Sequence, residues 1–200
     1  MEPIRAFIAI ELPSQIKASL SQLQDTLKKS RSASVKWVAT EGIHLTLKFL
    51  GNVDEGEIPA LKEALSEAVR GIDPFNLALG NPGAFPNIQA PRVVWVGVVG
   101  EVETLITLHN NIKDVLTPLG FSPEVRAFSP HLTLGRVRDE APSVERRHLG
   151  EVIASLKGGE GSSFKVDSLS LMRSRLTKEG AIYNRLALFA LGSRGTDCAK

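Results

Sequence analysis

The sequence predicts a protein of mixed helices and strands, built as two related lobes. The tetrapeptide HLTL occurs at 44–47 and returns 87 positions later at 131–134. Arg5 opens the apolar segment RAFIAIELP and Arg92 opens RVVWVGVVG, and in each case the HLTL histidine follows 39 positions later. Segments with the periodicity of strands and of helices alternate through both halves. An identical tetrapeptide at an equal spacing favours two related halves over the rough repetition that any chain of alternating strands and helices shows.

Length and composition are those of an ordinary globular protein. Two hundred residues, 42% of them hydrophobic, suit one domain or two small lobes over one core. The net charge of +2 permits a local basic patch but does not demand one. The single cysteine, Cys198, excludes an intramolecular disulfide and CxxC-type zinc sites. The first residues are too interrupted for a signal peptide, and no apolar run approaches the ~20 residues that span a bilayer. We therefore expect a soluble, cytoplasmic protein without a membrane partner, and a monomer.

The first half reads as strands and two helices. Strands are expected at 4–10, 35–38, 44–50 and 75–79, where the segments are β-prone and mostly apolar. A helix should open at Pro13-Ser14, with one apolar face made of Ile16, Leu20, Leu23 and Leu27. Asp54 and Glu57 resemble a capping box and should start a second helix, with its inward face made of Ile58, Leu61, Leu65 and Val69.

The second half repeats this order after a Gly/Pro-rich loop expected at 80–91. The segment 92–99 is apolar on both faces and should be a central strand. A third helix should turn Leu105, Leu108, Ile112, Val115 and Leu119 inward. After the strand that begins at His131, Pro142-Ser143 should open a fourth helix. Two strands, near 163–173 and 181–191, should close the chain as a hairpin.

The H-x-T-x pattern places chemistry on one face of each strand. Side chains alternate along a strand, so His44 and Thr46 share one face while the leucines anchor the other in the core. The same holds for His131 and Thr133. If the lobes are related by a pseudo-twofold axis, the two polar faces meet across a cleft. Two opposed imidazoles suit in-line displacement at phosphorus, because a neutral one can accept the nucleophile's proton while a protonated one donates to the leaving oxygen.

The remaining parts of such a site are also present near the second motif. Threonine hydroxyls can hydrogen-bond non-bridging phosphate oxygens, and Arg136 can balance their charge if a bulge at Gly135 turns it inward. The alternative is that both histidines merely cap buried strands and have no catalytic role. Metal binding is disfavoured, because zinc sites recruit further ligands, and His109 and His148 lie in helical stretches without ligand spacing. We expect those two on helix surfaces.

Five segments together resemble a known family: RAFIAIELP, HLTLKFLG, RVVWVGV, PHLTLGRV and SLMRSRLTKEGAIYNRL. They are similar to the two-histidine (2H) phosphoesterases, and within these to the RNA 2′,3′-cyclic phosphodiesterases, also called 2′-5′ RNA ligases. The resemblance implies an α+β, bilobal, LigT-like fold with two antiparallel sheets facing a central cleft, helices outside and lobes related by a pseudo-twofold. We expect one such domain over 1–192 and a polar tail over 193–200.

The resemblance also implies roles and a reaction. His44 matches the proton donor and His131 the proton acceptor, while Thr46, Thr133 and Arg136 match phosphate-holding positions. No metal or other cofactor is implied. The implied reaction opens an RNA terminal 2′,3′-cyclic phosphate, on tRNA halves or oligonucleotides, and leaves a 2′-phosphate. Run backwards with a 5′-hydroxyl RNA, the same groups would form a 2′-5′ link.

Several residues carry weaker predictions. Phe7 could stack a base or belong to the core, and Lys48 could reach phosphate or be a solvated lysine at a strand end. Tyr183 could pack or touch a base, and the 80–91 loop could gate the cleft or merely connect. The final hairpin carries four basic residues that either steer an RNA backbone or are scattered surface charge: Arg173, Arg175, Lys178 and Arg185. Two other functions stay open, a 2H phosphodiesterase acting on a small cyclic nucleotide or an ADP-ribose cyclic phosphate, and a non-catalytic RNA-binding module.

Overall fold

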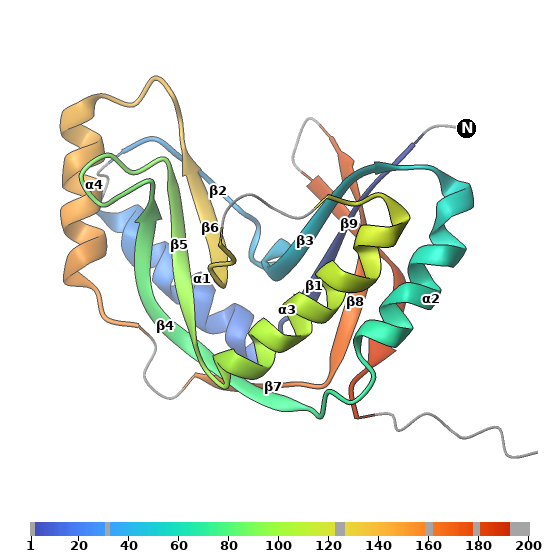
Figure 1. Ribbon diagram of the computed structural model, residues 1–200. Helices are drawn as coiled ribbons and strands as arrows, with labels where there is room; N and C mark the ends of the chain where they lie inside the picture. The colour runs from blue at the N-terminus through green and yellow to red at the C-terminus, as the bar shows by residue number, and fades with distance from the viewer. Residues whose placement is uncertain (1–2, 31–32, 123–126, 159–161, 178–180, 193–200) are drawn as a thin grey trace, which may run out of the picture.

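Two antiparallel sheets, with helices on their outer sides, make up the fold in Figure 1. It comes from a computed structural model that describes residues 3–30, 33–122, 127–158, 162–177 and 181–192. The first sheet has the strand order β3-β1-β8-β9 and the second has the order β2-β6-β5-β4-β7. This confirms the expected α+β fold of two antiparallel sheets.

The strands of the first sheet are β1 (Ile4–Glu11), β3 (His44–Val53), β8 (Ser168–Leu176) and β9 (Ala181–Ala190). Those of the second are β2 (Val35–Trp37), β4 (Phe75–Phe85), β5 (Val93–Gly100), β6 (His131–Val137) and β7 (Ser163–Val166). Each sheet therefore contains one histidine strand, β3 in the first and β6 in the second. As expected, the segment near 92–99 forms the middle strand of its sheet, β5.

The four helices are α1 (Ser14–Lys29), α2 (Ile58–Ala68), α3 (Val102–Leu116) and α4 (Ser143–Ser155). α1 and α4 begin after Pro13 and Pro142, as predicted, and the capping box is present, with the Asp54 N–H donating to Glu57 Oε2 at 3.0 Å. α1 contacts α4, and α2 contacts α3. The predicted inward residues are buried or partly buried with one exception, Leu119, which is 38% exposed in a short 3₁₀ turn after α3.

One contiguous core joins the two sheets to their helices. The anchoring leucines of both histidine strands belong to it, since Leu45 and Leu132 are 0% exposed and Leu47 and Leu134 at most 2%. Their burial fixes which face of each strand turns away from the core. The predicted in-and-out alternation at both HLTL segments is confirmed.

The halves of the chain exchange strands. β2 comes from the first half but pairs with β6 in the second sheet, and β8 and β9 come from the second half but complete the first sheet. In Figure 1 the orange to red strands β8 and β9 lie with the dark blue β1, and the light blue β2 lies beside β6. β6 thus pairs with strands from both halves of the chain, whereas β3 is an edge strand that pairs only with β1.

Two predicted boundaries are wrong. The strand expected at 163–173 is divided at Asp167 into β7 and β8, which belong to different sheets. Residues 80–85, expected in a loop, instead continue β4 to Phe85. The register of β4 against β5 shifts between Leu79 and Pro82, so the proline lies at an irregularity where its missing N–H is tolerated.

No helix among the described residues is long and apolar enough to cross a membrane. The tail expected at 193–200, with Cys198, lies outside the described residues.

Candidate active site

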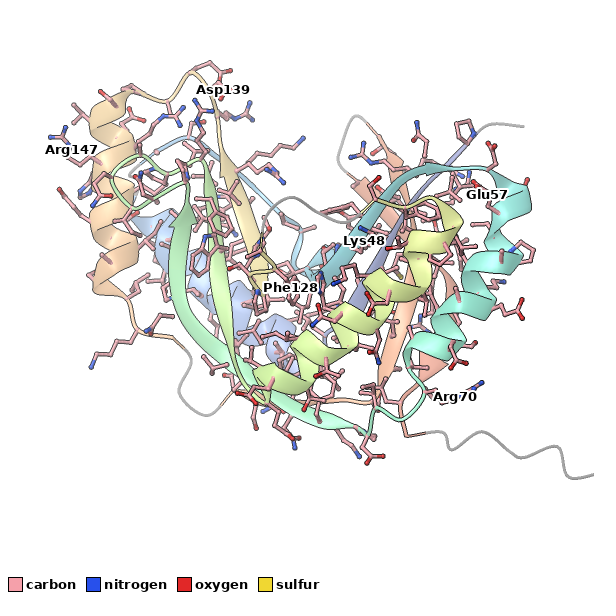
Figure 2. The ribbon with its side chains drawn as sticks, in the orientation of Figure 1. Lys48, Glu57, Arg70, Phe128, Asp139 and Arg147 are labelled. Carbon is pink, nitrogen blue, oxygen red and sulfur yellow. The ribbon has the colours of Figure 1, made fainter. Side chains whose placement is uncertain are left out.

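A cleft of about 530 Å³ lies between the two histidine strands. It is lined by His44, Thr46 and Phe49 of β3, by His131, Thr133 and Arg136 of β6, and by other side chains that include Phe85, Phe128 and Tyr183. Figure 2 marks Phe128, between the two lobes. The five polar residues that the sequence singled out, two histidines, two threonines and one arginine, therefore share one cavity.

The two imidazoles are held in the same way. Nδ1 of His44 lies 2.8 Å from the Gly42 carbonyl oxygen, and Nδ1 of His131 lies 2.7 Å from the Ser129 carbonyl oxygen. A carbonyl oxygen only accepts, so Nδ1 carries the hydrogen in both rings. Nε2 of each ring is then the atom that accepts a proton when neutral and donates one when charged.

Matching bulges follow the two histidine motifs. On β3, Thr46 pairs with Ala9 but Lys48 already pairs with Ile8, so Leu47 is an extra residue. On β6, Thr133 pairs with Trp95 and Gly135 with Val94, so Leu134 is extra. An extra residue reverses the facing of the side chains that follow it.

The bulge on β6 turns Arg136 into the cleft, as the sequence predicted. The bulge on β3 does the same for Phe49, which lines the cleft and is 64% exposed. Sequence reasoning missed Phe49, although it stands five positions after His44 as Arg136 stands five after His131.

Lys48 is placed on the other side of its strand by the same bulge. Strict alternation predicts Lys48 on the face of His44, but it is 5% exposed and its Nζ donates to the Ser122 carbonyl oxygen at 2.9 Å. Both interpretations of the sequence, a phosphate contact and a solvated lysine, are therefore wrong. Lys48 joins β3 to the segment that follows α3 (Figure 2).

His44 stands in an aromatic pocket. Its ring stacks on Phe7, with the ring centres 4.6 Å apart, and meets the edge of Tyr183 at 5.0 Å. Phe7 is 2% exposed, which favours a supporting role beneath His44 over a stacking contact with a base. Tyr183 packs on these rings, which confirms one of its two expected roles, and it also lines the cleft, where a contact with a base stays a prediction. Burial lowers the pKa of His44 below its ordinary value, while the hydrogen bond to Gly42 and the charge of Glu11 act to raise it.

His131 has different neighbours. Phe85 meets its ring edge-on at 5.0 Å, and Trp95 lies 6.3 Å away. The segment before it is anchored by Phe128, which stacks on His109 of α3 at 4.1 Å with the rings 9° from parallel. His109 was expected only on a helix surface, and the stack gives it a packing role behind the cleft. His148 matches that expectation, with a side chain that is 57% exposed and 3.6 Å from Glu151.

The basic residues of the β8–β9 hairpin are divided between two faces. Arg185 pairs with Met172, which shares a face with Phe7, whereas Arg173 pairs with Ala6 on the opposite face. Arg185 is already engaged, since its Nε and Nη2 donate to the Glu11 carboxylate at 2.7 and 2.9 Å. Arg175 lies two positions beyond Arg173 on β8 and shares its face, and Lys178 lies outside the described residues. The three described basic residues, Arg173, Arg175 and Arg185, therefore do not gather on one face of the hairpin.

Among the described residues, no group of three or more His, Cys, Asp or Glu side chains is arranged to hold a metal ion. The chemistry that the cleft itself offers is proton transfer by two imidazoles, with hydroxyls and a guanidinium beside them.

Comparison with known proteins agrees with this geometry. The sequence profile of the LigT-like phosphoesterases matches residues 10–95 and matches again over residues 96–183. This chain belongs to the LigT-like phosphoesterase family. The double match over consecutive segments accords with the repeated histidine strands, and the resemblance to the 2H phosphoesterases is confirmed.

Relatives of this LigT-like phosphoesterase cover nearly its whole length. A protein of Methanothermobacter thermautotrophicus is 39% identical over 188 residues, which are 94% of this chain and 99% of that protein. A protein of Archaeoglobus fulgidus is 34% identical over 186 residues, which are 93% and 99% of the two chains. Both are named RNA 2′,3′-cyclic phosphodiesterase. The crystal structure of Escherichia coli LigT in its apo form has a TM-score of 0.76 to this LigT-like phosphoesterase at 29% identity, with 96% of this chain and 99% of LigT covered.

Proposed function

We propose that this protein is an RNA 2′,3′-cyclic phosphodiesterase that opens a terminal cyclic phosphate to a 2′-phosphate. The observation that carries the proposal is the pair of imidazoles in one cleft, each held through Nδ1 by the carbonyl two positions before it. The names of relatives that align over more than nine-tenths of this chain support the choice of substrate.

The reaction needs one proton acceptor and one proton donor. His131 Nε2 removes a proton from water as the water oxygen attacks phosphorus. The bond from phosphorus to the 3′ oxygen breaks, and His44 Nε2 protonates that oxygen as it leaves. This assignment of the two roles follows the family resemblance. Because burial lowers the pKa of His44, its cation needs support, and the negative charge of the bound phosphodiester supplies part of it.

The other cleft residues hold the substrate. The hydroxyls of Thr46 and Thr133 donate to non-bridging phosphate oxygens, and Arg136 balances the charge that grows on them. The exposed ring of Phe49 offers a surface on which the terminal base stacks. The bound RNA ends are those of tRNA halves or other oligonucleotides, and the reverse reaction with a 5′-hydroxyl RNA gives a 2′-5′ link. No metal takes part, and the protein acts as a cytoplasmic monomer.

The test is a pair of alanine variants with a matched control. His44→Ala and His131→Ala should each lower hydrolysis of a 2′,3′-cyclic-phosphate oligonucleotide by about 10²- to 10⁴-fold, the contribution typical of a general acid or base. His148→Ala makes the same change on an exposed face of α4 and should keep full activity. Chemical denaturation checks that each variant is folded. A folded His44 or His131 variant with near-full activity contradicts the proposal.

The products identify the substrate class and the bond that breaks. Chromatography against 2′- and 3′-phosphate standards should show only the 2′-phosphate. A 3′-phosphate would mean that the substrate lies in the opposite direction in the cleft. A cyclic mononucleotide cleaved better than an oligonucleotide would favour a small cyclic nucleotide as the natural substrate.

A further inference from the structure

The two histidine strands are alike, but the strands beside them are not. Both carry HLTL, the same bulge and the same Nδ1 hydrogen bond. In the first sheet the residue directly opposite His44 is Glu11 of β1. In the second sheet the residue directly opposite His131 is Gly97 of β5. One imidazole therefore has a carboxylate as its cross-strand neighbour, and the other has no side chain there.

Glu11 is firmly held in that position. Its Oε1 accepts from Ser170 Oγ at 2.6 Å and from Arg185 Nε at 2.7 Å, and its Oε2 accepts from Arg185 Nη2 at 2.9 Å. The fork of Arg185 meets the carboxylate with two parallel bonds, the most directional form of such a pair. The bonds to Arg185 lower the pKa of Glu11, so the carboxylate stays ionised wherever a histidine titrates.

We propose that Glu11 is a positioning residue that selects His44, and not His131, as the proton donor. The inference rests on the proposed function, which requires one donor and one acceptor from two strands that carry the same HLTL motif. A fixed negative charge beside an imidazole favours its cation, and the cation is the form that donates. With Gly97 opposite, His131 lacks this bias and is left as the acceptor.

Other charges near His44 do not supply the same bias. The described groups around it and its carboxylate neighbour are Lys17 of α1, Tyr183 and Arg185 of β9, and His131 and Arg136 of β6 across the cleft. Lys17 acts against the cation, and its Nζ donates to the Glu41 carbonyl oxygen at 2.9 Å. Arg185 is bound to Glu11, and its positive charge offsets part of the effect of the carboxylate on His44. The Glu11 carboxylate acts to raise the pKa of His44, whereas burial and the charge of Lys17 act to lower it.

The first experiment removes the charge and keeps the shape. In Glu11→Gln the amide oxygen can still accept from Arg185 or Ser170, but the negative charge is gone. The titration of His44, followed by NMR of its imidazole protons and assigned with His44→Ala, should move to lower pH, while the other imidazoles titrate as in the parent protein. Glu41→Gln is the matched control, because it removes an exposed carboxylate three positions from His44 and should move nothing.

The pH profile of kcat/KM distinguishes a positioning role of Glu11 from a general structural defect. With a cyclic-phosphate oligonucleotide, Glu11→Gln should move the alkaline limb of the kcat/KM profile to lower pH and leave the acidic limb in place. On the alkaline side the loss should be about three- to tenfold, since above its pKa an imidazole is protonated about tenfold less often when that pKa falls by about one. A purely structural defect would lower kcat/KM by a similar factor on the acidic and the alkaline limb.

The second experiment adds the missing carboxylate to the other strand. A Cβ at Gly97 would meet the Asn81 carbonyl oxygen at 3.4 Å and the Trp95 ring at 3.6 Å, which is ordinary contact, so the backbone position accepts a Cβ. Gly97→Glu should move the acidic limb to higher pH, because the acceptor then holds its proton more strongly. Gly97→Gln is its uncharged control and should leave the limb in place.

The outcomes distinguish this inference from the proposed function. An unchanged His44 titration in folded Glu11→Gln overturns the role of Glu11, whether or not the protein cleaves cyclic phosphate. Absence of activity in the parent protein overturns the proposed function and leaves the NMR result to decide on Glu11. Equal movement of both limbs in Glu11→Gln also overturns the selection of one histidine.

Discussion

Gln24 offers a direct test of how the second histidine strand is held in shape. It lies on the inner face of α1, is 1% exposed, and its Nε2 donates to the carbonyl oxygens of Val38 and Leu134, both at 2.9 Å. Leu134 is the extra residue of the β6 bulge, and its carbonyl also accepts from the Val38 N–H at 2.9 Å. One amide therefore fixes the bulge that turns Arg136 into the cleft.

Replacing Gln24 by Leu keeps the bulk of the side chain and removes both donors. Each bond contributes about 0.5–1.5 kcal/mol net, so two of them amount to about 1–3 kcal/mol in the free energy of unfolding. A loss of about 2 kcal/mol in a domain of this size corresponds to a melting temperature lower by roughly 4–8 °C. The activity should also fall, because the carbonyl that defines the bulge is no longer held.

The assay is urea denaturation of Gln24→Leu beside Gln22→Leu, the same change at an exposed position of the same helix. The control should stay within about 0.5 kcal/mol of the parent protein. A Gln24 variant as stable as the control would refute the view that these two hydrogen bonds hold the bulge. Full activity in a destabilised variant would show that the bulge keeps Arg136 in place without them.

Three further predictions concern the cleft and its surroundings. Lys48→Met should lower the free energy of unfolding by about 1–3 kcal/mol through the lost bond to Ser122, yet keep kcat/KM within a few-fold of the parent. A loss of activity without a loss of stability would show that Lys48 contacts the substrate. Burial lowers the pKa of His44, and the protonated donor is lost as pH rises through that lowered value; His44→Ala should therefore abolish the alkaline decline of the residual kcat/KM, and an unchanged alkaline decline contradicts the donor role. Activity should persist in excess EDTA, because two histidines supply both proton transfers, and a loss on chelation that one added metal restores would show otherwise.

Local patterns in the sequence were enough to predict the helices and the facing of the side chains in both HLTL segments. Spacing of apolar residues and the caps at Pro13, Asp54 and Pro142 located the helices, because these signals act within a few turns of backbone. The alternation of side chains along a strand sufficed to put His44 and Thr46 on one face, with leucines on the other. The same local rule, applied beyond Leu47, failed for Lys48 and overlooked Phe49.

The positions of the bulges and the pairing of the strands depend on tertiary structure, because no local pattern in the sequence encodes them. A bulge is a mismatch between two strands, so its position depends on the partner strand and is absent from the periodicity of either one. The division at Asp167, which assigns β7 and β8 to different sheets, likewise depends on which edges are open for pairing. The neighbour of each histidine follows from register as well. Glu11 and Gly97 stand 33 and 34 positions before their histidines, and only the pairing of β1 with β3 and of β5 with β6 brings a carboxylate to one imidazole and none to the other.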